Sequence, residues 1–108
     1  MTPEQKIKNE IKRFITAQKG FWSVIQGGPY SKPGDPDIVC CIKGLYVAIE
    51  AKTINGRLSD MQILRGKEIE RAGGIWIVAR SVGDVESEFR RRGLIENGDQ
   101  SGVEEITL

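Results

Sequence analysis

Residues 36–52, PDIVCCIKGLYVAIEAK, decide the fold. Two runs rich in β-branched and apolar residues, 37–42 and 45–51, read as strands. Lys43-Gly44 between them is a two-residue hairpin signal, because glycine accepts the positive φ that a tight turn needs. The stretch therefore predicts an antiparallel hairpin.

This hairpin would bring two acids face to face. With Lys43-Gly44 as the loop, paired positions add up to 87, so Asp37 lies opposite Glu50 with Cβ atoms about 4.5–5.5 Å apart. Facing carboxylates repel unless they share a cation or a proton. Lys52 points to the same face, roughly 7 Å further along the strand. The plainer alternative is a solvated strand end at which Lys52 forms a simple ion pair.

The sequence on both sides of the hairpin predicts further elements from helical and strand periodicity, caps and Gly/Pro punctuation. Thr2-Pro3 begins the first helix, and a Gly/Pro-rich loop precedes the hairpin. The expected elements are a helix over 3–19, a strand over 21–25, loops over 27–36 and 53–58, a helix over 59–72, a strand over 75–79 and a helix over 81–92.

These elements predict an α/β fold with a mixed four-stranded sheet flanked by helices. The first three strands are joined closely enough to form an antiparallel meander. The fourth strand follows a helical crossover, so it should run parallel to the third. The length of 108 residues suits one domain, with a core of about 3–93 and a tail over 94–108 whose structure the sequence does not assign.

The chain contains no histidine. That excludes a Ser-His or Cys-His nucleophile pair within the chain, histidine-ligated zinc and histidine as general base. Any hydrolytic chemistry would depend on carboxylates, lysine and a hard metal ion.

The charge is unevenly distributed. Residues 1–57 hold nine Lys/Arg and five Asp/Glu, whereas 58–108 hold seven and ten. The first helix is the most basic stretch and carries Lys6, Lys12 and Arg13. This pattern fits a solvated helix face or a surface for nucleic-acid phosphates.

We expect an intracellular, cytoplasmic protein, because no apolar run is long enough to cross a membrane and the N-terminus lacks an apolar signal region. Cys40 and Cys41 are neighbours, which suggests no disulfide framework. They are expected to be small core residues on opposite faces of a strand.

Two further residues each allow two interpretations. Glu10 interrupts the apolar stripe of the first helix, as an edge glutamate that reaches water or as a third carboxylate at the cation site. Gln62 completes a capping box with Ser59, and its amide could also orient Lys52 or a phosphate.

The motif Pro36-Asp37, twelve residues, then Glu50-Ala51-Lys52 resembles the PD-(D/E)xK nuclease signature. Together with Glu10 and the Ser59-x-x-Gln62 pair it resembles the VRR-NUC domain, in the stand-alone form found in phages. The resemblance extends over residues 4 to 80. It implies a restriction-endonuclease-like core in the order αβββαβ.

The resemblance also implies roles for the residues of the motif. Asp37, Glu50 and the Ala51 carbonyl would bind Mg²⁺ or Mn²⁺, with Glu10 acting through water or at a second metal. Lys52 would position or help deprotonate the attacking water. Gln62 would hold Lys52 or the scissile phosphate.

The function that follows is a metal-dependent, structure-selective DNA endonuclease, acting as a homodimer on branched DNA such as four-way (Holliday) junctions. The alternatives are an inactive nucleic-acid-binding subunit with the same fold, or a regulatory interaction domain. Besides the basic helix, Tyr30 and Lys32 in the loop before Asp37 are the candidates for contacting DNA.

Overall fold

The computed structural model describes residues 1–25 and 32–95. Its elements follow the predicted order, with boundaries within two residues of those expected. They are α1 (Pro3–Ala17), β1 (Phe21–Val24), β2 (Ile38–Ile42), β3 (Leu45–Ala51), α2 (Asp60–Arg71), β4 (Ile75–Ala79) and α3 (Val82–Arg91).

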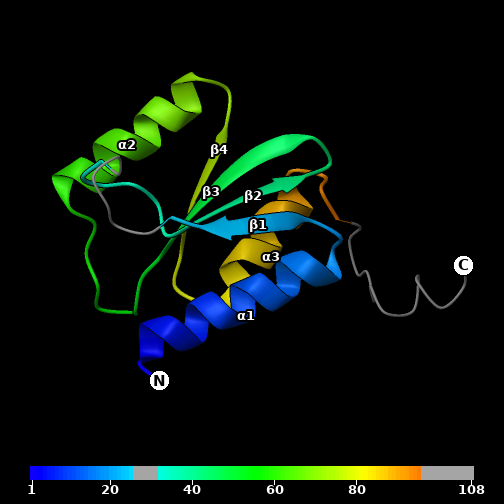
Figure 1. Cartoon of the computed structure of the whole chain (residues 1–108), viewed down its shortest axis with the longest axis horizontal. Coiled ribbons are helices and arrows are strands. Elements are labelled where there is room, and N and C mark those ends of the chain that lie inside the picture. The colour runs from blue at the N-terminus through cyan, green and yellow to red at the C-terminus, as the bar shows by residue number, and fades with distance from the viewer. Residues whose placement is uncertain (26–31, 96–108) are drawn as a thin grey trace, which may run out of the picture.

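The sheet has the order β1-β2-β3-β4, with β1, β2 and β3 antiparallel and β4 parallel to β3. Helices α1 and α3 contact each other on one face, while α2 covers β4 from the other (Figure 1). The mixed four-stranded α/β sheet expected from the sequence is therefore confirmed.

The hairpin register is also confirmed. Ile38 pairs with Ile49 and Ile42 with Leu45, so paired positions add up to 87. Lys43 and Gly44 have φ values of 50° and 78°, the left-handed pair that matches the twist of two antiparallel strands. The turn chemistry thus fixes which side chains of β3 face each layer.

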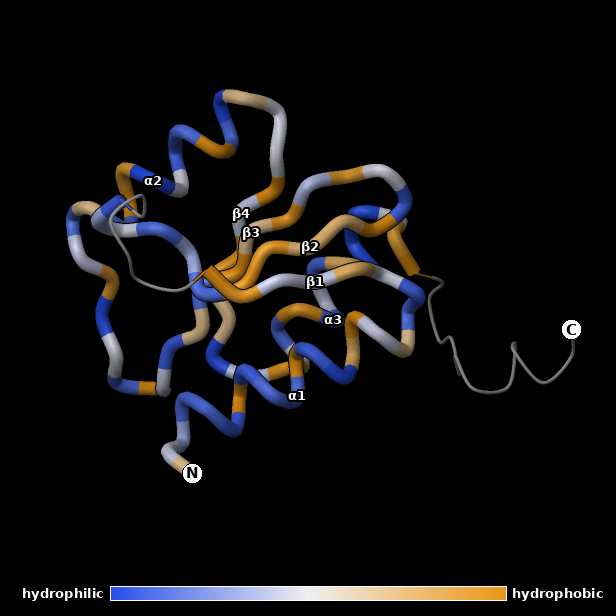
Figure 2. The backbone as a smooth tube through the Cα atoms, in the orientation of Figure 1, coloured by the Kyte–Doolittle hydropathy of each residue, from blue (hydrophilic) through white to orange (hydrophobic). Residues whose placement is uncertain are grey.

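The core lies between the sheet and the α1–α3 layer, and Figure 2 shows the hydrophobic residues gathered in the central strands. Cys40 is buried there as predicted. Cys41 is exposed on the opposite face, so its predicted core position is wrong, because α2 covers only the β4 side of that face. Leu94 and Ile95 are buried in the core, so the packed part extends past residue 93.

Helix α2 reaches the sheet through a glycine. Gly66 is buried, and a Cβ atom there would lie 2.2 Å from the indole carbons of Trp76. The absent side chain is what lets the helix backbone sit directly on the ring.

Gly66→Ala is therefore expected to destabilise the protein by about 1–3 kcal/mol through overpacking, measured by urea denaturation. Gly83→Ala in α3 is the matched control. Its nearest neighbour would be 3.5 Å away, so it should show the gain of roughly 0.5–1 kcal/mol usual for this change in a helix. A Gly66→Ala protein as stable as wild type would contradict this packing.

Across residues 1–25 and 32–95, no helix is long and apolar enough to span a membrane.

Candidate active site at the end of strand β3

The site forms around Glu50, near the end of the apolar strand β3. Glu50 is only 2% exposed and is the one buried charged residue of the described chain. Its Oε1 accepts a hydrogen bond of 3.0 Å from Nε2 of Gln62, whereas no N–H or hydroxyl group of the described residues donates to its buried Oε2. A hydrogen bond between Glu50 and Asp37 forms only when the two carboxyl groups share a proton. A buried carboxylate oxygen without a partner is costly, so this atom is a candidate ligand for a cation.

Gln62 forms the expected capping box, and its amide makes a second contact with a residue other than the expected Lys52. Its Oε1 accepts from the Ser59 backbone N–H (2.8 Å), and its own N–H donates to the Ser59 hydroxyl (3.1 Å), which completes the capping box. Its Nε2 donates to Glu50. The Gln62 Oε1, which is the atom that could accept from the Lys52 ammonium, already accepts from Ser59. The start of α2 thereby holds the carboxylate in place.

Asp37 lies directly before β2, beside Glu50. Its Oδ2 accepts from the Ala51 backbone N–H (2.9 Å), and its hydrogen bond and negative charge act on Glu50. The facing acids predicted from the hairpin are therefore brought together, although Asp37 sits one residue outside the strand.

The Ala51 carbonyl points toward the β2 side of β3, as does the Ala51 N–H that donates to Asp37. The Asp37 carbonyl accepts from Ile25 on the β1 side (3.2 Å), so in the alternating backbone its neighbours Pro36 and Ile38 face β3. Continuing the register two residues beyond its last pair, Ile38 with Ile49, sets Pro36 opposite Ala51. Pro36 has no N–H to donate. The Ala51 carbonyl therefore receives no backbone hydrogen bond from Pro36.

Helix α1 brings Glu4 and Lys8 to the cluster. The Lys8 ammonium lies 3.4 Å from Glu4 Oε2 and 3.5 Å from Asp37 Oδ1. Burial alone would lower the pKa of Lys8, but Asp37 and Glu4 raise it above its ordinary value. Glu10, the acid expected here, is six residues from Glu4 and so about 120° around the helix. The acid whose charge reaches Glu50 is Glu4.

Lys52 is half-buried directly after β3. Its backbone N–H donates to the Ala79 carbonyl (2.9 Å), and its positive charge opposes the upward shift of the Glu50 pKa. The carboxylates of Glu50, Asp37 and Glu4 and the ammonium groups of Lys8 and Lys52 therefore gather near the end of β3, next to the Ala51 carbonyl.

Burial, followed by the hydrogen bond and charge of Asp37, raises the pKa of Glu50 to about 8. Between the ordinary carboxyl pKa and pH 8, the folded protein then holds a proton that the unfolded chain releases. Metal-free stability should consequently fall as the pH rises through this window.

We expect the free energy of unfolding, measured by urea denaturation in EDTA, to decrease by a few kcal/mol between about pH 5 and pH 8. Glu50→Gln keeps the acceptor for Gln62 and removes the titration, so its curve should be flatter over this range. Parallel curves for the two proteins would show that Glu50 does not titrate in this window.

The donor set fits a hard divalent ion. Mg²⁺ and Mn²⁺ prefer carboxylate and carbonyl oxygens and retain several waters. Glu50 Oε2, Asp37 and the Ala51 carbonyl are oxygens of this kind. No cluster of three or more Asp, Glu, Cys or His side chains of metal-binding geometry occurs in the described ranges, so two carboxylates and a backbone carbonyl are the candidate set.

The loop before Asp37 is fastened to α2. Arg65 Nη2 donates to the Pro33 carbonyl (3.0 Å), and its Nε lies 3.4 Å from Asp35. Gly34 has φ 83°, and a Cβ atom there would lie 2.3 Å from the Met61 carbonyl. These contacts were missed from the sequence, and they fix the backbone that leads into Asp37.

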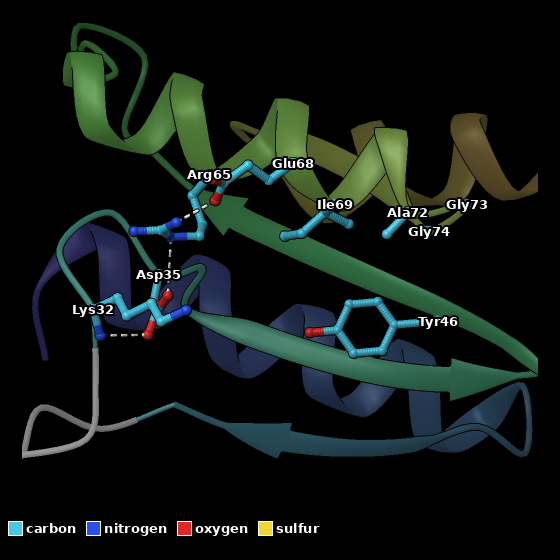
Figure 3. A pocket seen from close by; sticks show the side chains of 9 residues that line it. All are labelled: Lys32, Asp35, Tyr46, Arg65, Glu68, Ile69, Ala72, Gly73 and Gly74. Carbon is cyan, nitrogen blue, oxygen red and sulfur yellow. Dashed lines mark hydrogen bonds and ion pairs between the residues drawn. The ribbon is translucent and has the colours of Figure 1, made fainter.

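A pocket of about 560 Å³ lies beside this loop (Figure 3). Arg65 pairs with Asp35 and Glu68 at one end, and burial together with Asp35 raises the pKa of Tyr46. Arg65 is thus neutralised by two acids. Among the described residues that line the pocket, Lys32 is the positively charged side chain without an ion pair. The lining residues are Lys32, Asp35, Tyr46, Arg65, Glu68, Ile69, Ala72, Gly73 and Gly74.

The structure does not gather the expected DNA-binding residues of α1 into one patch. Lys6 and Arg13 are exposed on one face of the helix, whereas Lys12 is about 100° around it and lies over the Trp22 ring, 5.2 Å from its centroid. Tyr30 lies outside the described residues.

The fold has solved counterparts. A VRR_NUC domain matches with a TM-score of 0.70 at 20% identity, covering 81% of this chain and 94% of that one. Hjc of Archaeoglobus fulgidus, a Holliday junction resolvase, matches with a TM-score of 0.54 at 20% identity, covering 69% of this chain and 65% of its own. Neither the protein-family models nor the curated sequences give a match. The chain thus has the restriction-endonuclease-like fold of a VRR-NUC domain.

Proposed function

We propose that this protein is a metal-dependent endonuclease that hydrolyses phosphodiester bonds in branched DNA. The observation that carries the proposal is the buried Glu50, which interacts with Asp37 and has one oxygen that no N–H or hydroxyl group of the described chain satisfies, with Lys52 two residues further on. A purely structural carboxylate would be expected to have both oxygens satisfied.

Each residue then has a role. Asp37, Glu50 and the Ala51 carbonyl would hold Mg²⁺ or Mn²⁺. Such an ion lowers the pKa of a bound water and stabilises charge developing on phosphorus. Lys52 would hold the attacking water and balance the phosphate charge. Gln62 would act by keeping Glu50 in place, since that is the carboxylate to which it donates.

Substrate contacts would come from the elements that flank the site. Lys12 lines a groove of about 400 Å³ between α1 and β1, where a phosphate backbone could follow the helix. Lys6, Arg13, Lys32 and Tyr30 are the further candidates. Binding through such residues should weaken steeply with salt.

A four-way junction is the first substrate to test, because one neighbour of this fold is a Holliday junction resolvase. A chain with a single site can cut two strands symmetrically only as a pair, so we propose a homodimer. Light scattering of the free protein and of the protein–junction complex measures the oligomeric state.

The deciding experiment is a cleavage assay with a four-way junction and a sequence-matched linear duplex, each with Mg²⁺, Mn²⁺ or EDTA. We expect the junction to be cut faster than the duplex, and no cleavage in EDTA. Junction, flap and duplex all left intact with either ion would refute the nuclease. Tight, salt-dependent binding without cleavage would instead indicate an inactive binding subunit.

A further inference from the structure

Arg80, the residue directly after strand β4, closes the turn that follows Lys52. The turn spans residues 53–56, with the Gly56 N–H donating to the Thr53 carbonyl (3.0 Å). Arg80 Nη1 donates to the same Thr53 carbonyl (2.6 Å) and to the Gly56 carbonyl (2.7 Å). One guanidinium nitrogen therefore holds both ends of the turn.

Arg80 is itself firmly placed. It is half-buried, and its backbone N–H donates to Asp84 Oδ2 (2.8 Å) in the first turn of α3. The preceding Ala79 carbonyl accepts from the Lys52 N–H (2.9 Å). The backbone on either side of the guanidinium is thus tied to both α3 and the end of β3.

The Lys52 side chain lies against this turn. A Cβ atom built on Gly56 would be 3.5 Å from Lys52 Cδ, an ordinary van der Waals contact. Among the described residues, the Lys52 ammonium has no carboxylate within the 4.0 Å of an ion pair. No ion pair within the described ranges therefore sets the position of the ammonium, and its aliphatic stem passes beside the turn at Gly56.

We propose that Arg80 is a positioning residue for the reaction. Its guanidinium fixes the 53–56 turn, and the turn holds the Lys52 ammonium at the site shared with Glu50. The inference rests on the proposed function, and it assigns a task to a side chain that contacts neither DNA nor metal in the proposed reaction. Misplacing a reacting group by about 1 Å can cost on the order of 100-fold in rate.

Arg80→Gln should therefore lower kcat for junction cleavage by about 10- to 100-fold with little change in KM. Arg80→Lys should recover much of the loss, because an ammonium can donate to both carbonyls. Arg71→Gln removes the same charge at the exposed C-terminal end of α2, and it should cleave like wild type. A lower kcat in Arg71→Gln, or an unchanged kcat in Arg80→Gln, would overturn the assignment.

A second readout does not depend on cleavage. The four proteins are treated with a limiting acetylating reagent, and mass spectrometry gives the modification rate of Lys52 relative to the exposed Lys43 in the same molecule. We expect this ratio to rise several-fold in Arg80→Gln, to rise less in Arg80→Lys and to stay constant in Arg71→Gln.

An unchanged ratio in both folded Arg80 variants would refute the positioning role, whether or not the protein cleaves DNA. Failure of wild type to cleave any substrate would refute the proposed function while the acetylation ratio still decides the role of Arg80. Should Arg80→Gln not fold by circular dichroism, Arg80→Lys carries both comparisons against wild type.

Discussion

Replacing Lys52 by methionine is expected to lower the rate of DNA cleavage by about 10²- to 10⁴-fold, the range typical of losing a proton-transfer group. Methionine keeps the length of the side chain and the apolar stem that passes beside Gly56, so the fold and the turn should survive. DNA binding should change by no more than a few-fold, since one of many phosphate-facing charges is lost. Single-turnover cleavage and fluorescence anisotropy with a labelled junction measure the two quantities.

Lys43→Met is the control for charge. Lys43 is exposed at the opposite end of the hairpin, and its loss should leave the single-turnover rate unchanged. If Lys52→Met cleaved within a few-fold of wild type, Lys52 would have no part in the chemistry.

Asp37→Asn is expected to weaken Mn²⁺ binding by more than the roughly 10- to 100-fold that loss of an outer-sphere partner costs. The amide removes one of two anionic ligands but keeps an oxygen that can accept from the Ala51 N–H. The variant should consequently fold, and its loss of affinity can be assigned to the site. Isothermal titration calorimetry measures the affinity directly.

Asp60→Asn supplies the comparison for Asp37→Asn. Asp60 is an exposed acid in the first turn of α2, so its replacement should leave Mn²⁺ affinity as in wild type. Equal affinities for wild type and Asp37→Asn would exclude Asp37 as a ligand.

The hairpin was predictable because its information is local. Lys43 and Gly44 permit a two-residue turn, and the turn then fixes the register of every facing pair. That register placed Asp37 beside Glu50 and put Lys52 on the same side. The capping box likewise fixed the start of α2, which is what delivers Gln62 to Glu50.

The sequence did not indicate correctly which glutamate of the first helix lies near Glu50. Glu4 lies on the line of the buried Ile11 and Ile15, seven and eleven residues away, and this spacing was a usable signal. However, an acid in the first turn of a helix is also favoured by the helix macrodipole. The position of Glu4 therefore did not by itself indicate that it lies near the site. Glu10 also interrupts the apolar stripe, but it lies toward its edge.

The contacts of Arg65 and Arg80 could not be predicted. Each links segments 24 to 32 residues apart, from Arg80 to the turn after Lys52 and from Arg65 to the loop before Asp37. Local periodicity and capping rules carry no information about pairs at such separations. Only the packing of α2 on the sheet and the pairing of β4 with β3 bring these guanidinium groups to their carbonyls.

The claim that Asp37, Glu50 and the Ala51 carbonyl bind a divalent ion is tested most directly by locating the ion in the folded protein. Crystals grown with Mn²⁺ and measured at the manganese absorption edge should show an anomalous peak within about 2.0–2.3 Å of Asp37, Glu50 and Ala51 carbonyl oxygens. Retention of Lys52 beside that peak would support the proposed chemistry. A crystal with bound Mn²⁺ elsewhere, or with none between these oxygens at millimolar Mn²⁺, would contradict it.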